Sequence, residues 1–155
     1  SGYLEKQPAY SIDLALMKYT LFYVQDMNRF IGLLSDTLKP GGRLVAYAKW
    51  ADSLERYSTN AQYFINGREI PEGETVSLKD GDQYTIKFLR ESGNPKAGHI
   101  PGAETVVFYH SADKIRSLAS QYGLDCQLGD WKTLLPEKNQ GDEDMDQDVL
   151  ILRKD

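Results

Sequence analysis

The sequence has 155 residues, of which 41% are hydrophobic and 26% charged, values typical of an ordinary globular domain and not of a disordered or fibrous chain. The net charge of -5 argues weakly against a large nucleic-acid surface, and no apolar run approaches the ~20 residues of a membrane helix. Cys126 is the only cysteine, which excludes an intrachain disulfide. We expect a single domain over 1–155 and, because no secretory signal pattern opens the chain, a cytoplasmic location.

The first segment, 12–50, predicts a strand, a helix and a second strand. The apolar run at 12–17 is typical of a strand buried on both faces. Asp26 is suited to cap a helix over 26–38. Apolar residues recur there at steps of three and four, at Met27, Phe30, Ile31, Leu34 and Leu38.

The helix is expected to stop at Pro40-Gly41-Gly42, because proline cannot continue it and glycine can turn the chain. The run at 44–47 then predicts a second buried strand. A strand, a crossover helix and a strand together predict parallel neighbours with a right-handed connection.

The middle of the chain predicts antiparallel β structure, which we place at 60–102. A short helix is expected first, at 52–57. Alternating or apolar runs follow at 62–65, 75–78 and 84–88, separated by an Asn66-Gly67 turn and a second turn at 79–82. The glycine- and proline-rich segment 91–102 is expected to be a loop.

The last segment, 103–155, predicts one helix and the closing strands. An apolar run at 105–109 leads into a helix over 111–122, which Ser111 would cap and Gly123 would end. Strands are expected at 124–128 and 149–152. The fold class is therefore α/β, with an antiparallel β insertion.

The order of these motifs resembles the C-terminal half of the class I S-adenosylmethionine-dependent methyltransferases. The resemblance rests on Asp13-Leu14, then Leu21-Phe22-Tyr23-Val24, then Leu38-Lys39-Pro40-Gly41-Gly42. It implies a partial Rossmann-like sheet with local strand order 4-5-7-6, in which the last strand is antiparallel. The glycine-rich cofactor loop of that family has no counterpart in this sequence.

The resemblance also implies candidate site residues. The end of strand four would contact S-adenosylmethionine through Met17, Lys18 and Tyr19. Candidate residues for the methyl acceptor are Phe22, Tyr23, Trp50 and Tyr109. His110, at a strand-to-helix junction, is the candidate acid or base, although a capping or surface role fits the same position. Packing alone explains the apolar members of this set better than a binding role.

No metal site is expected. The acidic run 142–148 resembles the opening of a calcium-binding loop, but Gln147 and Arg153 occupy the positions where that loop requires glycine and glutamate. A solvated hairpin tip explains the run better.

The predicted topology also bears on partners. The strand at 12–17 would lie at an edge of the sheet, and both long helices would cover one face, leaving apolar surface exposed. We therefore expect a homodimer, or a second chain that pairs with this edge strand.

Two functions remain open. The first is a methyltransferase, or half of one, that uses S-adenosylmethionine to methylate a small molecule. The second is a non-catalytic binding or assembly protein that retains the half-fold.

Overall fold

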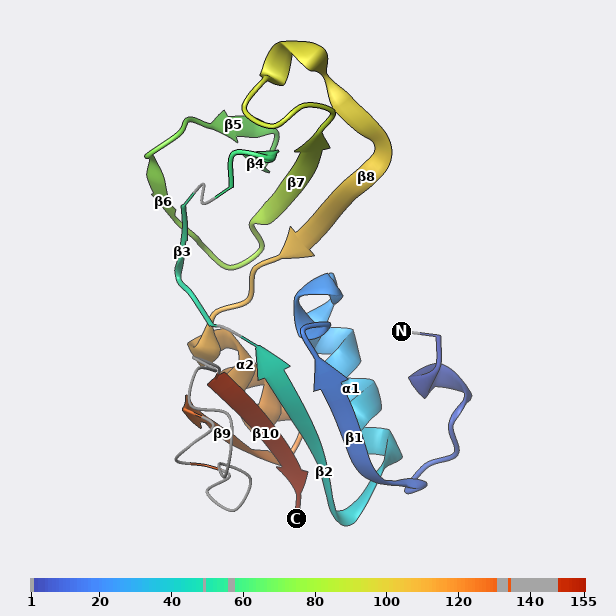
Figure 1. Cartoon of the computed structure of the whole chain (residues 1–155). Helices are drawn as coiled ribbons and strands as arrows, with labels where there is room; N and C mark the ends of the chain where they lie inside the picture. Colours follow the sequence, from blue (N-terminus) through green and yellow to red (C-terminus); the bar gives the residue numbers. More distant parts are fainter. Residues whose placement is uncertain (1, 49, 56–57, 131–133, 135–147) are drawn as a thin grey trace, which may run out of the picture. The chain divides into compact units, whose positions relative to one another are not determined.

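The computed structural model describes residues 2–48, 50–55, 58–130, 134 and 148–155, and its helices and strands form a mixed α/β fold (Figure 1). Its contacts divide the chain into two compact units. The first contains 1–50 and 112–155, and the second contains 51–111. The sequence analysis treats the chain as one domain with an insertion at 60–102, and the second unit contains that insertion.

In its described residues, the first unit contains one four-stranded sheet, two α-helices and two short 3-10 helices. Its elements are η1 (Leu4–Lys6), β1 (Ile12–Lys18), η2 (Leu21–Tyr23), α1 (Met27–Thr37), β2 (Leu38–Ala48), α2 (Ala112–Gln121), β9 (Leu124–Asp130) and β10 (Asp148–Lys154). The strand order is β1-β2-β10-β9 (Figure 1). β1 and β2 run parallel, and β10 runs antiparallel to both of its neighbours. This is the arrangement expected for a strand–helix–strand unit whose closing strand is inserted from the C-terminus.

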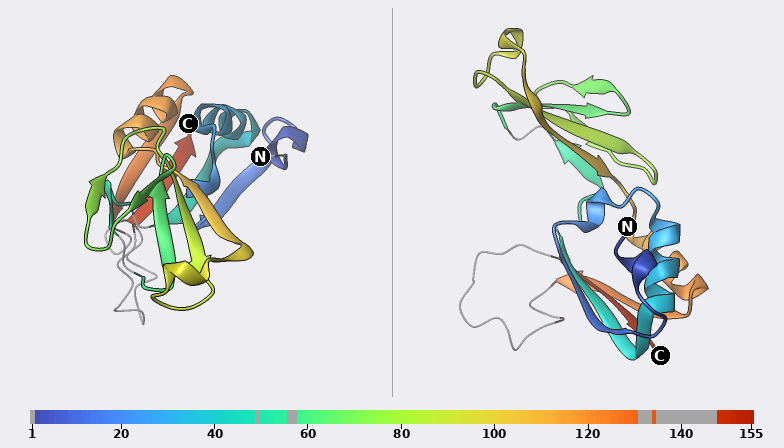
Figure 2. Two further views of the ribbon diagram at one scale, coloured as in Figure 1. Left: turned by 90° about the horizontal axis from the view of Figure 1, so that it is seen from above. Right: turned by 90° about the vertical axis from the view of Figure 1, so that its right-hand side faces the viewer.

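Both helices pack on the same face of this sheet (Figure 2, right). The core on that face joins Ile31 and Leu34 of α1, Ile115 of α2, and Leu44 and Leu150 of the sheet, all of them buried. On the opposite face, Val45 and Val149 form a smaller buried cluster, against which Leu134 packs. The apolar stripe recognised at 27–38 is therefore the face that α1 presents to the core.

Helix α1 begins as predicted. Asp26 is its N-cap, and its Oδ1 accepts a hydrogen bond of 2.9 Å from the backbone N–H of Arg29. This carboxylate satisfies one of the amides that the first turn of a helix leaves without a partner.

Replacing Asp26 with alanine is expected to lower the free energy of unfolding by about 1 kcal/mol, because the Arg29 amide loses its acceptor. Chemical denaturation followed by circular dichroism measures the change. Asp26→Ser is the matched control, since a serine hydroxyl can still accept this hydrogen bond. Equal losses in both variants would show that the cap does not stabilise α1.

The prediction that the first strand is buried on both faces is wrong. Leu14 is 49% exposed and Leu16 is 67% exposed, whereas Ala15 and Met17 pack against the core beneath the helices. β1 is an edge strand of the described sheet, and its leucines point to the face opposite α1 and α2. An apolar run shows that a strand is hydrophobic but does not show how many layers cover it.

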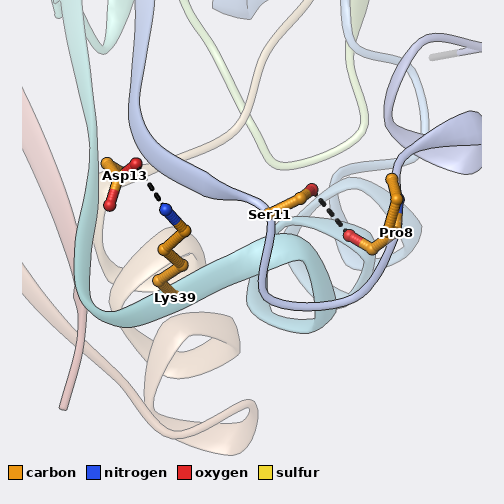
Figure 3. Close-up of polar contacts among 4 residues, drawn as sticks. All are labelled: Pro8, Ser11, Asp13 and Lys39. Atoms are coloured by element: carbon orange, nitrogen blue, oxygen red, sulfur yellow. Dashed lines mark hydrogen bonds and ion pairs between the residues drawn. The ribbon is translucent and has the colours of Figure 1, made fainter.

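The helix ends before Pro40-Gly41-Gly42 and Gly41 has a left-handed φ of 78°, as predicted, but this segment lies within β2 and not between the helix and the strand. α1 ends at Thr37 and β2 begins at once with Leu38. The segment Lys39–Gly42 forms a bulge within β2, because Leu38 pairs with Ile12 and the next pair is Arg43 with Leu14. Across this bulge the Lys39 Nζ lies 2.7 Å from the Asp13 Oδ2, while the Ser11 hydroxyl donates a hydrogen bond to the carbonyl of Pro8 (Figure 3).

The second unit is built of antiparallel strands around its own core. They are β3 (Ser53–Glu55), β4 (Ala61–Ile65), β5 (Arg68–Ile70), β6 (Thr75–Ser77), β7 (Gln83–Leu89) and β8 (His99–Phe108), with η3 (Pro95–Ala97) before β8. One sheet has the order β5-β4-β7-β8, and β3 pairs with β6. Tyr63 and Ile70 are among the buried residues of the core.

The two predicted turns are present. Asn66 and Gly67 both have positive φ, 48° and 86°, as a two-residue hairpin between β4 and β5 requires. In the second turn the N–H of Asp82 donates to the carbonyl of Lys79 at 2.9 Å. The strands flanking this second turn do not pair with each other, since β6 pairs with β3 and β7 with β4.

Two local predictions in this unit are wrong. Where a helix was expected at 52–57, the structure has the strand β3 at 53–55, and residues 56 and 57 lie outside the described residues. The Leu54 side chain is buried, whereas Ser53 and Glu55 on either side are exposed. The expected loop at 91–102 ends earlier, because β8 already begins at His99 and pairs with Leu89. β8 also contains most of the run at 105–109, which the sequence analysis groups with the last helix.

Candidate functional site

A pocket of about 580 Å³ lies at the carboxyl end of β1. It belongs entirely to the first unit and is enclosed by η1, the end of β1, η2 and the first turns of α1. Its lining residues are Tyr3, Leu4, Met17, Thr20, Tyr23, Val24, Gln25, Asp26, Arg29, Phe30 and Leu33. A volume of this size lies within the range of about 300–1,000 Å³ that is usual for small-molecule sites.

The wall of this pocket is mainly apolar and carries a few polar groups. Asp26 caps α1, and one turn later the Arg29 Nη2 lies 2.8 Å from the Glu5 Oε1 of η1. The Arg29 and Glu5 side chains are both more than a third exposed, so this ion pair contributes little stability. Asp26 and Arg29 line the pocket, so both can contact a polar ligand there.

The three predicted cofactor residues do not all face this pocket. Met17 lines it, whereas Lys18 and Tyr19 are not among the lining residues. The Lys18 Nζ lies 5.7 Å from the centre of the Tyr19 ring. Tyr19 has a φ of 55°, in the left-handed region, where the chain leaves β1 for η2. The cofactor role of these residues stays a prediction.

The predicted substrate residues of the first unit divide into two places. Tyr23 lines the pocket. Phe22 instead packs edge-on against Trp50, with ring centres 5.2 Å apart, and the backbone N–H of Trp50 donates to the Asp148 Oδ2 at 2.8 Å. Such an aromatic pair stabilises packing and can also form one wall of a binding surface.

Tyr109 and His110 belong to the second unit, where both are buried. Burial, followed by the nearby carboxylates of Asp52 and Asp80, raises the pKa of the Tyr109 hydroxyl above its ordinary value. Its hydroxyl therefore stays protonated at neutral pH. Asp80 also accepts hydrogen bonds from the backbone N–H and the hydroxyl of Ser111, at 2.6 and 2.8 Å. The catalytic assignment of His110 stays a prediction.

The sequence analysis missed most of the polar lining of the pocket, including Thr20, Gln25 and Arg29. No pattern singles them out, because their proximity depends on how η1, η2 and α1 meet.

The sequence analysis also missed a chain of hydrogen-bonded polar side chains in the second unit. The His99 Nε2 lies 2.7 Å from the Gln62 Oε1, and the Gln62 amide nitrogen donates to Glu69. These residues come from β8, β4 and β5, which the strand pairing brings together.

Burial raises the pKa of the Cys126 thiol, so the reactive thiolate is disfavoured at neutral pH. Within the described ranges no cluster of three or more His, Cys, Asp or Glu residues could hold a metal ion. Residues 142–147 of the acidic run lie outside the described residues, as does Trp131. Neither described helix has the length and apolar character needed to cross a bilayer.

Comparison with known proteins gives matches to solved structures only. No protein-family model matches the sequence, and no similar sequence was found among curated proteins. Similar folds occur in an S-adenosylmethionine-dependent methyltransferase from Mesorhizobium loti (18% identity, TM-score 0.49) and in one from Clostridium acetobutylicum (10%, 0.48). A third is an amino pentose methyltransferase from Micromonospora echinaspora (11%, 0.47).

The matches cover almost all of this chain but only part of the other proteins. The chain is covered to 97%, 97% and 94%, whereas the three structures are covered to 66%, 62% and 59% of their lengths. The chain thus spans less than two thirds of the structures it matches. Because the identities are low and the TM-scores lie below 0.5, these similarities do not establish family membership.

Proposed function

We propose that this chain is the C-terminal half of a class I S-adenosylmethionine-dependent methyltransferase that acts on a small molecule. In this proposal β1, β2, β10 and β9 correspond to strands four, five, seven and six of the family sheet. The carboxyl end of β1 then contributes part of the cofactor site, and the second unit is an insertion between β2 and α2 in the sequence.

The observation that carries the proposal is the order β1-β2-β10-β9 with a pocket at the carboxyl end of β1. Ligands of open α/β sheets bind beyond the carboxyl ends of the parallel strands. β1 and β2 are the parallel pair in this sheet, and the pocket lies where such a ligand would bind. The sequence motifs that resemble the family occur on these same two strands and on η2.

The lining of the pocket supports binding of one portion of the cofactor. Apolar groups such as Met17 and Phe30 suit the methylene and sulfonium region, while Asp26 and Arg29 carry charges complementary to an ammonium and a carboxylate. When bound, S-adenosylmethionine would supply an activated methyl group. The chain's own contribution would be to position the two reactants in a water-poor pocket, which accounts for much of the rate in such transfers.

The first test is binding of S-adenosylhomocysteine, the demethylated cofactor, followed by amide chemical shifts in NMR. We expect weak binding, with a dissociation constant of about 1 mM or higher, because the glycine-rich loop of the family has no counterpart in the sequence. The shifts should concentrate at Met17, Thr20 and Asp26. Adenosine alone should shift these amides less, since it lacks the amino-acid portion.

A matched pair of tyrosine variants makes this test specific. Tyr23 lines the pocket and is 54% exposed, whereas Tyr10 is 58% exposed and does not line it. Tyr23→Ala should weaken or abolish the shifts, and Tyr10→Ala should leave them unchanged. Absence of shifts at the end of β1 at several times the expected dissociation constant would contradict the proposal.

The alternative is a non-catalytic binding or assembly protein. It is favoured by the exposed Leu14 and Leu16 on an edge strand, which suit a contact with another chain more than catalysis. A chain that associates with a partner but shows no response to S-adenosylhomocysteine would support this second function.

A further inference from the structure

One face of the four-stranded sheet in the second unit brings polar side chains together. Gln62 of β4 pairs with Lys87 of β7. Two residues further along β7, Leu89 pairs with His99 of β8. Residues two apart on a strand share a face, and so do residues opposite each other, so the Gln62 and His99 side chains lie on one face. Tyr63 and the core of this unit lie on the other face, because neighbours along a strand alternate.

Hydrogen bonds join three of these side chains across the sheet. The Gln62 amide nitrogen donates to the Glu69 Oε1 of β5, and the Gln62 Oε1 lies 2.7 Å from the His99 Nε2. Gln62 is only 7% exposed, so its amide group has little contact with water and depends on these two partners. The bonds therefore run from an exposed carboxylate through a buried amide to a histidine ring.

The chemistry of the three groups fixes the direction of each hydrogen bond. An ionised carboxylate can only accept, so the amide nitrogen of Gln62 must face Glu69. The carbonyl oxygen of Gln62 then faces His99 and can also only accept, which places a proton on the His99 Nε2. In the neutral ring the lone pair is consequently on Nδ1.

The His99 ring is held in place while its Nδ1 stays unused. Phe64 meets the ring edge-on, with ring centres 6.3 Å apart and planes at 68°. The Arg90 Nε donates a hydrogen bond of 3.0 Å to the backbone carbonyl of His99. Within the described part of the chain no group is hydrogen-bonded to Nδ1, and the residue is only half-buried. An imidazole oriented by a second side chain, with an unused lone pair, is typical of a general base.

We propose that His99 is a proton-accepting binding residue of the second unit. Its Nδ1 receives a hydrogen bond from the hydroxyl or amine group of a small molecule, and Glu69 positions the ring through Gln62. On proton transfer the O–H or N–H bond of that molecule breaks, the proton binds Nδ1, and the electron pair stays on the molecule. His110, the histidine that the sequence analysis favoured, is 8% exposed and suits this role less.

The ring tautomer is the first test, measured by nitrogen NMR of the histidines in the 155-residue chain at about pH 8, where an ordinary histidine is neutral. We expect a protonated Nε2 and an unprotonated Nδ1 in His99. Glu69→Ala removes the acceptor of the Gln62 amide, which can then turn over, so the ring should become a mixture of both tautomers. Because Glu69 is exposed, this variant should keep its fold, which circular dichroism verifies.

Glu104→Ala is the matched control. The Glu104 carboxylate is also exposed and lies 3.9 Å from the Lys87 Nζ, but it forms no hydrogen bond to Gln62 or His99. Its removal takes away the same charge and should leave the tautomer unchanged. The proposal is overturned if Nδ1 carries the proton in the unmodified chain, or if Glu69→Ala changes the tautomer no more than Glu104→Ala does.

Diethyl pyrocarbonate tests whether a small molecule can reach Nδ1. This reagent acylates unprotonated imidazole nitrogens, and mass spectrometry of peptides separates modified His99 from modified His110. We expect His99 to react at least about tenfold faster than His110, because the His110 side chain is buried. A His99 that reacts no faster than His110 would show that Nδ1 is closed to ligands and overturn the proposal. None of these readouts depends on S-adenosylmethionine, so they stand apart from the test of the cofactor pocket.

Discussion

Replacing Tyr63 with alanine is expected to lower the free energy of unfolding of the second unit by about 3–5 kcal/mol, the usual cost of deleting a large buried aromatic side chain. Tyr63 is 1% exposed and lies on β4, between β5 and β7. Its ring fills the centre of a core whose other buried members are few, namely Leu54, Ala61, Ile65 and Ile70. A small core has little capacity to collapse around such a cavity.

Amide hydrogen exchange of β4 and β7 measures this loss in the unit where it occurs. Tyr63→Phe is the matched control, because it keeps the ring and removes only the hydroxyl; we expect a loss of about 1 kcal/mol. Trp50 belongs to the first unit, so its fluorescence follows that unit and not the second. A loss below about 1 kcal/mol in Tyr63→Ala would contradict the central role of the ring.

Replacing Gly42 with alanine is expected to cost about 1–3 kcal/mol, the usual range for forcing an extra methyl group into a packed site. A Cβ at this position would lie 2.8 Å from the carbonyl oxygens of both Ile12 and Lys39. Both contacts are backbone atoms that hold the bulge of β2 against the start of β1. Relief therefore requires the strands to move apart. Thermal and chemical denaturation measure the loss.

Gly41 is the matched comparison within the same motif. It has a φ of 78° but open space around its Cα, so Gly41→Ala should cost about 1–2 kcal/mol from backbone conformation alone. Asparagine tolerates this conformation, so Gly41→Asn should recover part of the loss. Gly42→Asn should recover nothing, because its Cβ meets the same oxygens. If Gly42→Asn also recovered stability, the backbone conformation and not the steric contact would explain the loss at both positions.

Local chemistry in the sequence predicted several elements correctly. The apolar spacing at 27–38 and the capping residue Asp26 defined α1, because both signals act within a few residues. Asn66-Gly67 defined its hairpin for the same reason, since only that backbone geometry closes a two-residue turn. The parallel pairing of β1 with β2 followed from the helix between them.

The candidate site was predicted only in part. Met17 and Tyr23 line the pocket at the end of β1, whereas Lys18, Tyr19, Phe22 and Trp50 do not. Strand-end position could be read from the motif, but the direction of each side chain depends on the left-handed backbone at Tyr19 and on the path of η2. Both arise from packing between distant segments.

What the sequence determined by itself is therefore local: the two long helices, the tight turns, the apolar strands and the end of α1 before Pro40-Gly41-Gly42. The tertiary structure alone decided that Pro40-Gly41-Gly42 is a bulge, that β8 pairs with β7, and that Leu14 and Leu16 remain exposed. The physical reason is that hydrophobicity and backbone preference act on each residue separately. Burial and close approach depend instead on which distant segments pack against it.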